Sequence, residues 1–155
     1  MTCEEAMSRM TALCSTAEHC ESDVRQRLQR AGLAMDDADR VIEYLHKENY
    51  LNSARYCMAF SRDKLRFDHW GREKIARVLY MKGLPETDIR NAIDELPEEE
   101  YAQILDEAVG AKLRGMKKED SYTMRNKLMR FVLGRGFTMD EAQQAIASHL
   151  TEDDG

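Results

Sequence analysis

Apolar residues along this chain recur at helical spacing, and one pattern of them occurs three times. Each copy is centred on a glycine, at Gly32, Gly83 and Gly136, so that successive copies are 51 and 53 residues apart. Apolar residues stand eight and four positions before each glycine, and one, six and ten positions after it. The pattern predicts a helix, a tight turn and a second helix, because glycine readily adopts the left-handed conformation that ends a helix.

The complete pattern predicts an all-α protein of nine helices in three tandem three-helix repeats, forming an elongated, curved array. The expected repeats span residues 1–52, 53–96 and 97–155, and the third ends in a short acidic tail at 151–155. A single irregular helical bundle whose apolar spacings agree by chance is the alternative. Five matched positions in three copies argue against it. Repeat proteins commonly serve as binding proteins, so the pattern favours that class.

Local signals place the helix ends. Thr2 with Glu5 has the spacing of a capping box and predicts the start of the first helix. Either Ser22 or Asp23 is expected to cap the second helix. The stretch 114–121 lacks an apolar period and is expected to be a loop.

Charge is segregated along the chain although the net charge is only −6. Residues 55–82 carry eight basic and three acidic side chains, and residues 112–135 carry eight and two. Between them, residues 86–107 carry nine acidic side chains and one basic. Stacked repeats would align the basic helices into a stripe suited to a phosphate backbone or an acidic protein surface. The alternative is a set of solvated faces whose charges complement the helix dipoles.

Composition points to a cytoplasmic protein without a membrane segment. The first residues, Met-Thr-Cys-Glu-Glu-Ala-Met, are acidic and lack the apolar core of a secretory signal. No apolar stretch approaches the length that spans a bilayer. The four cysteines show no paired spacing, so we expect reduced thiols.

Catalytic chemistry has little support in the sequence. The four histidines are scattered, and no glycine-rich phosphate loop is present. Cys14, His19 and Cys20 lack the short ligand pairs of structural zinc sites. We therefore expect no enzyme activity, no cofactor and no metal. Major-groove reading by a helix-turn-helix is disfavoured as well, because the second helix of each repeat is acidic.

Several runs from position 49 onward resemble the RecX family of recombinase regulators. They are Asn49-Tyr50-Leu51-Asn52-Ser53-Ala54-Arg55-Tyr56-Cys57, Phe60-Ser61-Arg62-Asp63-Lys64, Trp70-Gly71-Arg72-Glu73-Lys74-Ile75, Leu79-Tyr80-Met81-Lys82-Gly83-Leu84 and Arg135-Gly136-Phe137-Thr138. The resemblance extends over residues 7–150. Asn52 and Ser53 stand where the family has an acidic pair, and Cys57 stands where it has alanine. The first departure is expected to weaken a helix cap, and neither touches the basic run.

The resemblance implies a non-enzymatic regulator of the RecA recombinase, acting in homologous recombination and DNA repair. Such proteins lie in the groove of the RecA–single-stranded DNA filament and suppress ATP hydrolysis, strand exchange and the co-protease activity of the SOS response. The expected form is a monomer, and direct contact with the single-stranded DNA backbone is possible in this arrangement. One alternative is a sequence-nonspecific nucleic-acid-binding repeat protein that acts directly on DNA. Another is a helical scaffold for an unrelated partner.

The expected contact surface consists of basic residues in the middle and last repeats. Trp70, beside Gly71, is expected to be partly exposed and available to a partner. The basic residues are Arg55, Arg62, Lys64, Arg66, Arg72, Lys74, Arg77, Lys82, Arg125, Arg130 and Arg135.

Overall fold

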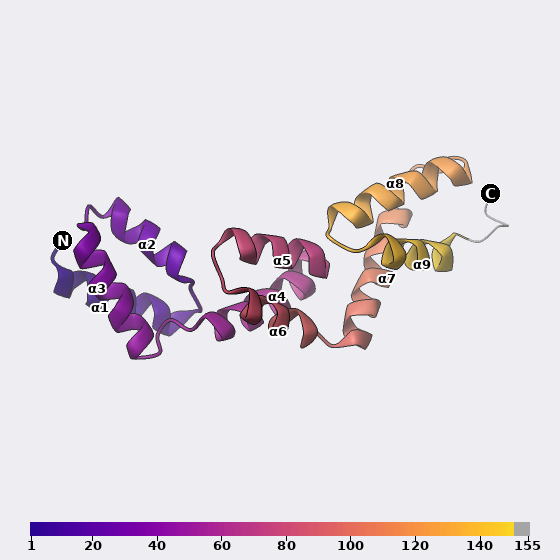
Figure 1. Ribbon diagram of the computed structural model, residues 1–155. Helices are drawn as coiled ribbons and strands as arrows, with labels where there is room; N and C mark the ends of the chain where they lie inside the picture. The colour runs from indigo at the N-terminus through magenta and orange to yellow at the C-terminus, as the bar shows by residue number, and fades with distance from the viewer. Residues whose placement is uncertain (151–155) are drawn as a thin grey trace. The chain divides into compact units, whose positions relative to one another are not determined.

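The computed structural model describes residues 1–150, and these form nine α-helices and no strand (Figure 1). The all-helical prediction is therefore confirmed. Of the loop expected at 114–121, residues 115–120 separate the seventh and eighth helices, whereas Arg114 and Ser121 are themselves helical. The acidic tail expected at 151–155 lies outside the described residues. The helices are α1 (Cys3–Thr16), α2 (Glu21–Arg30), α3 (Met35–Lys47), α4 (Ser53–Asp68), α5 (Arg72–Met81), α6 (Glu86–Asp94), α7 (Glu98–Arg114), α8 (Ser121–Gly134) and α9 (Met139–His149).

The chain folds into two compact units. The first contains Met1–Ala59 and Leu79–Ala92, and the second contains Phe60–Val78 and Ile93–Gly155, described up to residue 150. Helices α4, α5 and α6 therefore each contribute residues to both units. The repeat boundaries at 52/53 and 96/97 stay a prediction.

The three glycine turns have the same backbone geometry, as predicted. Gly32, Gly83 and Gly136 follow α2, α5 and α8 and have φ angles of 81°, 86° and 94°. In each turn the residue after the glycine donates its backbone N–H to the carbonyl five residues earlier, which is the Schellman arrangement. The bonds run from Leu33 to Leu28 at 3.1 Å, from Leu84 to Leu79 at 3.2 Å and from Phe137 to Val132 at 3.4 Å.

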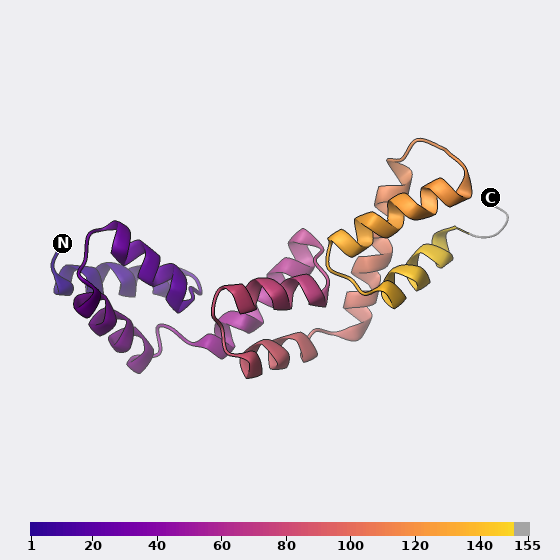
Figure 2. The same cartoon turned by 45° about the horizontal axis from the view of Figure 1, so that its top comes forward.

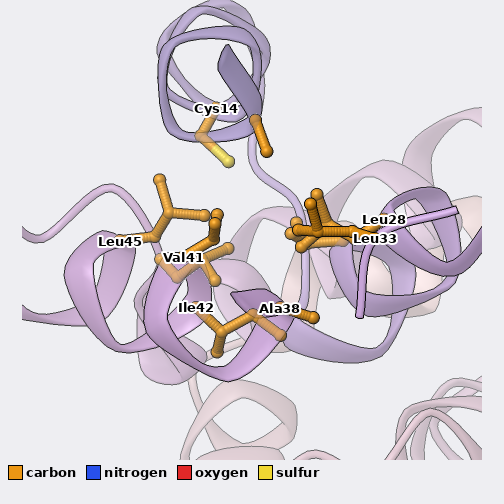
Figure 3. Close-up of a cluster of buried hydrophobic side chains, with 10 residues drawn as sticks. Cys14, Leu28, Leu33, Ala38, Val41, Ile42 and Leu45 are labelled. Carbon is orange, nitrogen blue, oxygen red and sulfur yellow. The ribbon is translucent and has the colours of Figure 1, made fainter. Parts of the chain in front are cut away.

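Helices α1, α2 and α3 enclose a core in the first unit (Figure 3). Cys14 comes from α1, Leu28 and Leu33 come from α2 and its turn, and the remaining labelled side chains come from α3. Val41 and Leu45 of α3 are completely buried. Each such aliphatic side chain contributes about 1.5–3 kcal/mol by leaving water, so this face of α3 holds the three helices together.

Helices α7, α8 and α9 pack pairwise in the second unit, with α8 and α9 side by side in Figures 1 and 2. Leu128 of α8 and Ile146 of α9 are almost completely buried. Phe137, in the turn between these helices, lies with its ring centroid 5.4 Å from that of Tyr101 in α7. The turn residue therefore brings all three helices into one core.

The first helix starts at the predicted cap, and the second does not. Thr2 accepts a hydrogen bond from the Glu5 backbone at 3.1 Å, as predicted. The prediction for the second helix was wrong, because α2 begins at Glu21 and its N-cap is Cys20, whose side chain makes no cap hydrogen bond. Cys20 is buried, and the Ser22 hydroxyl lies at hydrogen-bond distance, 3.2 Å, from its sulfur instead of capping the helix.

The side chain of Asn52 caps α4. Its Oδ1 accepts a hydrogen bond from the Arg55 backbone N–H at 2.9 Å. Asn52 thus caps the helix in place of the family's acidic residue, because asparagine caps helices about as well as aspartate does.

The raised pKa of the Cys57 thiol predicts that the protein loses stability at alkaline pH. Cys57 is completely buried, and this burial, followed by the nearby Asp88 carboxylate and Cys20, raises its pKa from 9.0 to about 11. The unfolded chain loses this proton near pH 9, whereas the folded chain keeps it up to about pH 11. We expect this group to lower the free energy of unfolding by about 1.4 kcal/mol per pH unit between those values.

Urea denaturation at a series of pH values measures this effect. The Cys57→Ala variant should lose stability less steeply than the wild type between pH 9 and 11. The raised pKa of Cys14 stays in both proteins and cancels in the comparison. Parallel pH profiles would contradict the assignment to Cys57.

Candidate partner-binding surface

Trp70 lies between two of the predicted lysines in the second unit. It lies two residues after the end of α4, and its backbone N–H bonds to the Lys64 carbonyl in that helix at 3.0 Å. The ammonium groups of Lys64 and Lys74 lie 4.7 and 4.5 Å from the centre of its indole ring. The Phe60 ring meets the indole edge-on at a centroid distance of 6.3 Å. Trp70 is half-buried, so these residues present two cations and an aromatic surface together.

The junction between α4 and α5 docks on the turn between α8 and α9. The Gly71 backbone N–H bonds to the Arg135 carbonyl at 2.7 Å, and the Glu73 N–H bonds to the Gly136 carbonyl at 3.0 Å. The Arg135 guanidinium in turn donates to the Asp68 carbonyl at 2.7 Å. A Cβ atom on Gly71 would meet the Gly136 carbonyl oxygen at 2.4 Å, so glycine is required here by close backbone approach.

Arg72 is held inside this junction by partners from two other helices. Its guanidinium lies 3.9 Å from the centre of the Tyr101 ring and pairs with Glu98 of α7 at 2.8 Å and with Glu141 of α9 at 3.6 Å. Burial is the main cause of a raised pKa at the Tyr101 hydroxyl, which also accepts a hydrogen bond from the Arg72 backbone. Arg72 therefore connects α5 to α7 and α9.

Arg66 is also paired, but on the exposed surface. Its Nε donates to the Glu100 carboxylate at 2.5 Å, and Nη2 makes a second bond at 3.3 Å. This hydrogen bonding raises the pKa of Arg66 and lowers that of Glu100. Both groups stay solvated, so the pair adds little to stability.

Substitutions of Arg72 and Arg66 are therefore expected to differ in their effect on the free energy of unfolding. Arg72→Gln should lower the free energy of unfolding by about 1–3 kcal/mol, because it leaves Glu141 and the Tyr101 ring without their partner. Arg66→Gln should change it very little, because the Arg66–Glu100 pair is solvated. Urea denaturation of both variants measures the difference, and an equal loss in the two would contradict a structural role for Arg72.

Four of the predicted cations are exposed and make no ion pair or side-chain hydrogen bond with any residue in 1–150. They are Arg62, Arg77, Arg125 and Arg130. Lys64 is partly compensated, since its ammonium group also pairs with Asp68 at 3.1 Å. The predicted arginines therefore fall into two groups. Some are paired within the fold, and the others are open to a partner.

Arg55 and Lys82 belong to the first unit, and both are paired there. Arg55 forms an ion pair with Glu18 and donates to the Asn49 carbonyl at 3.0 Å. Lys82 pairs with Asp23 at 3.3 Å. Their charges are largely compensated within that unit.

Three basic residues that share a concavity with the predicted Arg130 are missing from the predicted set: Lys112, Lys117 and Lys127. A cavity of about 500 Å³ between the end of α7 and the middle of α8 is lined by Lys112, Lys117, Lys127 and Arg130 together with Gly115, Met116 and Phe131. The excess of basic residues over 112–135 was the available signal. It identified the segment but not which side chains converge.

Two further properties of the described residues bear on function. Residues 1–150 contain no cluster of three or more histidine, cysteine, aspartate or glutamate side chains arranged to hold a metal ion. None of the described helices combines the length and the apolar character needed to cross a membrane.

The fold places the protein among all-helical proteins built of repeated three-helix units. The sequence models "RecX, second three-helix domain" and "RecX, third three-helix domain" match residues 52–93 and 98–146, which together make up more than half of the chain. The chain belongs to the RecX family.

Curated relatives agree with this assignment. The chain is 29% identical over 136 residues to "Regulatory protein RecX" of Clostridium perfringens (strain SM101 / Type A), covering 86% of this chain and 63% of that protein. Its identity to the protein of the same name from Clostridium botulinum (strain Eklund 17B / Type B) is 34% over 131 residues, covering 81% and 59%. The Salmonella heidelberg (strain SL476) protein of that name is 26% identical over 148 residues, covering 89% and 87%. The chain thus spans less than two thirds of the Clostridium perfringens and Clostridium botulinum proteins.

Two solved structures share the fold. "Crystal structure of regulatory protein RecX" superposes with a TM-score of 0.82 at 19% identity, covering 93% of this chain and 71% of that one. "Crystal structure of RecX from Lactobacillus salivarius" gives 0.79 at 15% identity, covering 94% and 95%.

Proposed function

We propose that this protein binds the RecA–single-stranded DNA filament and modulates it, mainly as an inhibitor of ATP hydrolysis, strand exchange and SOS co-protease activity. Its membership of the RecX family, whose curated members are named regulatory proteins, is the observation that carries the proposal. The protein acts by binding, as a cytoplasmic monomer and without a catalytic centre of its own.

The uncompensated cations support a charged partner. Arg62, Arg77, Arg125 and Arg130 are exposed and stay outside the ion pairs among residues 1–150. A nucleoprotein filament carries both phosphates and carboxylates, which are the groups that guanidinium binds in bidentate fashion. Exposed charges of this kind mainly accelerate association, so binding should weaken as salt rises.

Hydrolysis of ATP by RecA on single-stranded DNA tests the proposal. Sub-stoichiometric amounts of the protein should lower the steady-state rate, because a bound regulator acts on more than one subunit of a filament. Binding should also favour DNA-assembled RecA over DNA-free RecA. An unchanged rate at stoichiometric protein would contradict the proposal.

The second candidate function is direct binding to nucleic acid without RecA. The cluster of lysine and arginine side chains around the cavity between α7 and α8 favours it. The two functions differ in their requirement for RecA: assembly of RecA on the single strand should strengthen binding under the first function and should block it under the second.

A further inference from the structure

The cavity between α7 and α8 collects positive charge from three separate segments. Lys112 lies in the last turn of α7, Lys117 lies in the loop that follows, and Lys127 and Arg130 lie on α8. The spacing of three residues puts Lys127 and Arg130 on one face of their helix. Four cations therefore surround a single concavity of about 500 Å³, and no acidic residue lines it.

Ordinary stabilising interactions explain only part of this arrangement. Lys112 complements the negative end of the α7 dipole, and its ammonium group lies 5.4 Å from the centre of the Phe131 ring. Lys127 pairs with Glu119 at 2.7 Å. Lys117 and Arg130 are exposed and have no ion pair among the described residues. At least two of the four charges are therefore uncompensated.

Uncompensated like charges around one concavity repel each other over distances up to the Debye length, about 8 Å at physiological salt. An anion held between them would remove that repulsion and gain charge-assisted hydrogen bonds. The remaining lining is apolar: Met116 and Phe131 are both half-buried. The cavity thus combines an anion site with an apolar wall.

We propose that this cavity binds the backbone phosphate of single-stranded nucleic acid, with the adjoining sugar or base against Met116 and Phe131. A single strand fits because its bases are unpaired and can lie on apolar or aromatic side chains beside the phosphate contacts. The inference rests on the proposed function in one respect: the single strand is the DNA component of the filament. It adds Lys112, Lys117 and Lys127 to the interacting residues.

A pair of matched variants tests the site without RecA. Lys117→Ala/Arg130→Ala removes two lining charges, whereas Lys118→Ala/Arg114→Ala removes two exposed charges from the same loop and helix end that do not line the cavity. The full chain is titrated against a fluorescently labelled oligothymidylate over a range of salt concentrations, with anisotropy as the readout. Circular dichroism verifies that both variants keep the wild-type helix content.

The lining variant should bind the oligothymidylate more weakly and with a shallower salt dependence. Each phosphate contact on a single strand contributes about 0.7 to the slope of log affinity against log salt, so the loss of two contacts lowers the slope by about 1.4. The Lys118→Ala/Arg114→Ala variant should stay close to the wild-type slope. Equal slopes in the two variants, or no measurable binding by the wild type, would overturn the proposal.

Two further arms identify the source of the phosphate. Inorganic phosphate, exchanged for chloride at constant ionic strength, should displace the oligothymidylate only weakly, and a duplex of equal length should bind less tightly than the single strand. Full displacement by inorganic phosphate, or tighter binding of the duplex, would overturn the single-strand assignment. Inhibition of RecA ATP hydrolysis is measured separately, so a failure of this site and a failure of the proposed function are distinguishable.

Discussion

Replacement of Gly136 by alanine is expected to lower the free energy of unfolding by about 2–5 kcal/mol. The residue has a φ angle of +94°, where an L side chain costs about 1–2 kcal/mol. Its added Cβ would also lie 2.2 Å from the Lys74 Cβ and 2.6 Å from the Lys74 backbone nitrogen. Forcing apart such packed atoms costs about 1–3 kcal/mol more. Urea denaturation followed by circular dichroism measures the sum.

Gly32→Ala and Gly83→Ala are matched controls for the backbone effect alone. Both glycines have positive φ angles, of 81° and 86°, but an added Cβ would meet no atom within 4 Å. These variants should therefore lose only about 1–2 kcal/mol. Gly71→Ala isolates the packing effect, since its Cβ would clash with the Gly136 carbonyl. The same loss for Gly136→Ala as for Gly83→Ala would contradict the close docking of α5 on the α8–α9 turn.

Reversal of two exposed charges should strongly weaken regulation of RecA. In Arg62→Glu/Arg77→Glu, the concentration that half-inhibits ATP hydrolysis should rise by about tenfold or more, which corresponds to about 1.4 kcal/mol of binding. These positions are preferable to Lys74, whose ammonium group lies on Trp70 and whose backbone packs against Gly136. The difference from wild type should be largest at low salt and should shrink as screening increases.

Arg9→Glu/Arg40→Glu provides the control for net charge. Both residues are exposed, lie in the first unit and make no ion pair among residues 1–150, so the change in charge is identical. This variant should inhibit nearly as well as the wild type. Equal loss of inhibition in the two double variants would show a nonspecific effect of charge, and full potency of Arg62→Glu/Arg77→Glu would move the contact surface elsewhere.

The helices and glycine turns were predictable because their signals are local. Gly32, Gly83 and Gly136 each determine the conformation of their own turn, and the apolar residues on either side lie within about three helical turns of them. The missed start of α2 shows the limit of such signals. The N-cap is the buried Cys20, and the hydroxyl of Ser22 lies 3.2 Å from the Cys20 sulfur, a pairing that a capping preference does not indicate.

Whether each predicted cation is paired within the fold or open to solvent was not predictable from these local signals. The partner of Arg72 is 26 residues away, that of Arg66 is 34 away, and that of Arg135 is 67 away. The sequence does not indicate which carboxylate or carbonyl pairs with which guanidinium. Consequently it identified the basic segments but could not separate arginines that hold the fold together from arginines that are open to solvent.

The position of Trp70 between Lys64 and Lys74 has a spectroscopic consequence. The chain contains one tryptophan, so its intrinsic emission comes from a single indole with two ammonium groups within 5 Å of the ring centre. Indole emission responds to nearby charge. A partner carboxylate or phosphate that draws either lysine away changes the wavelength and intensity of that emission. The native protein therefore carries its own optical probe at the candidate surface, and association can be followed in real time without a label.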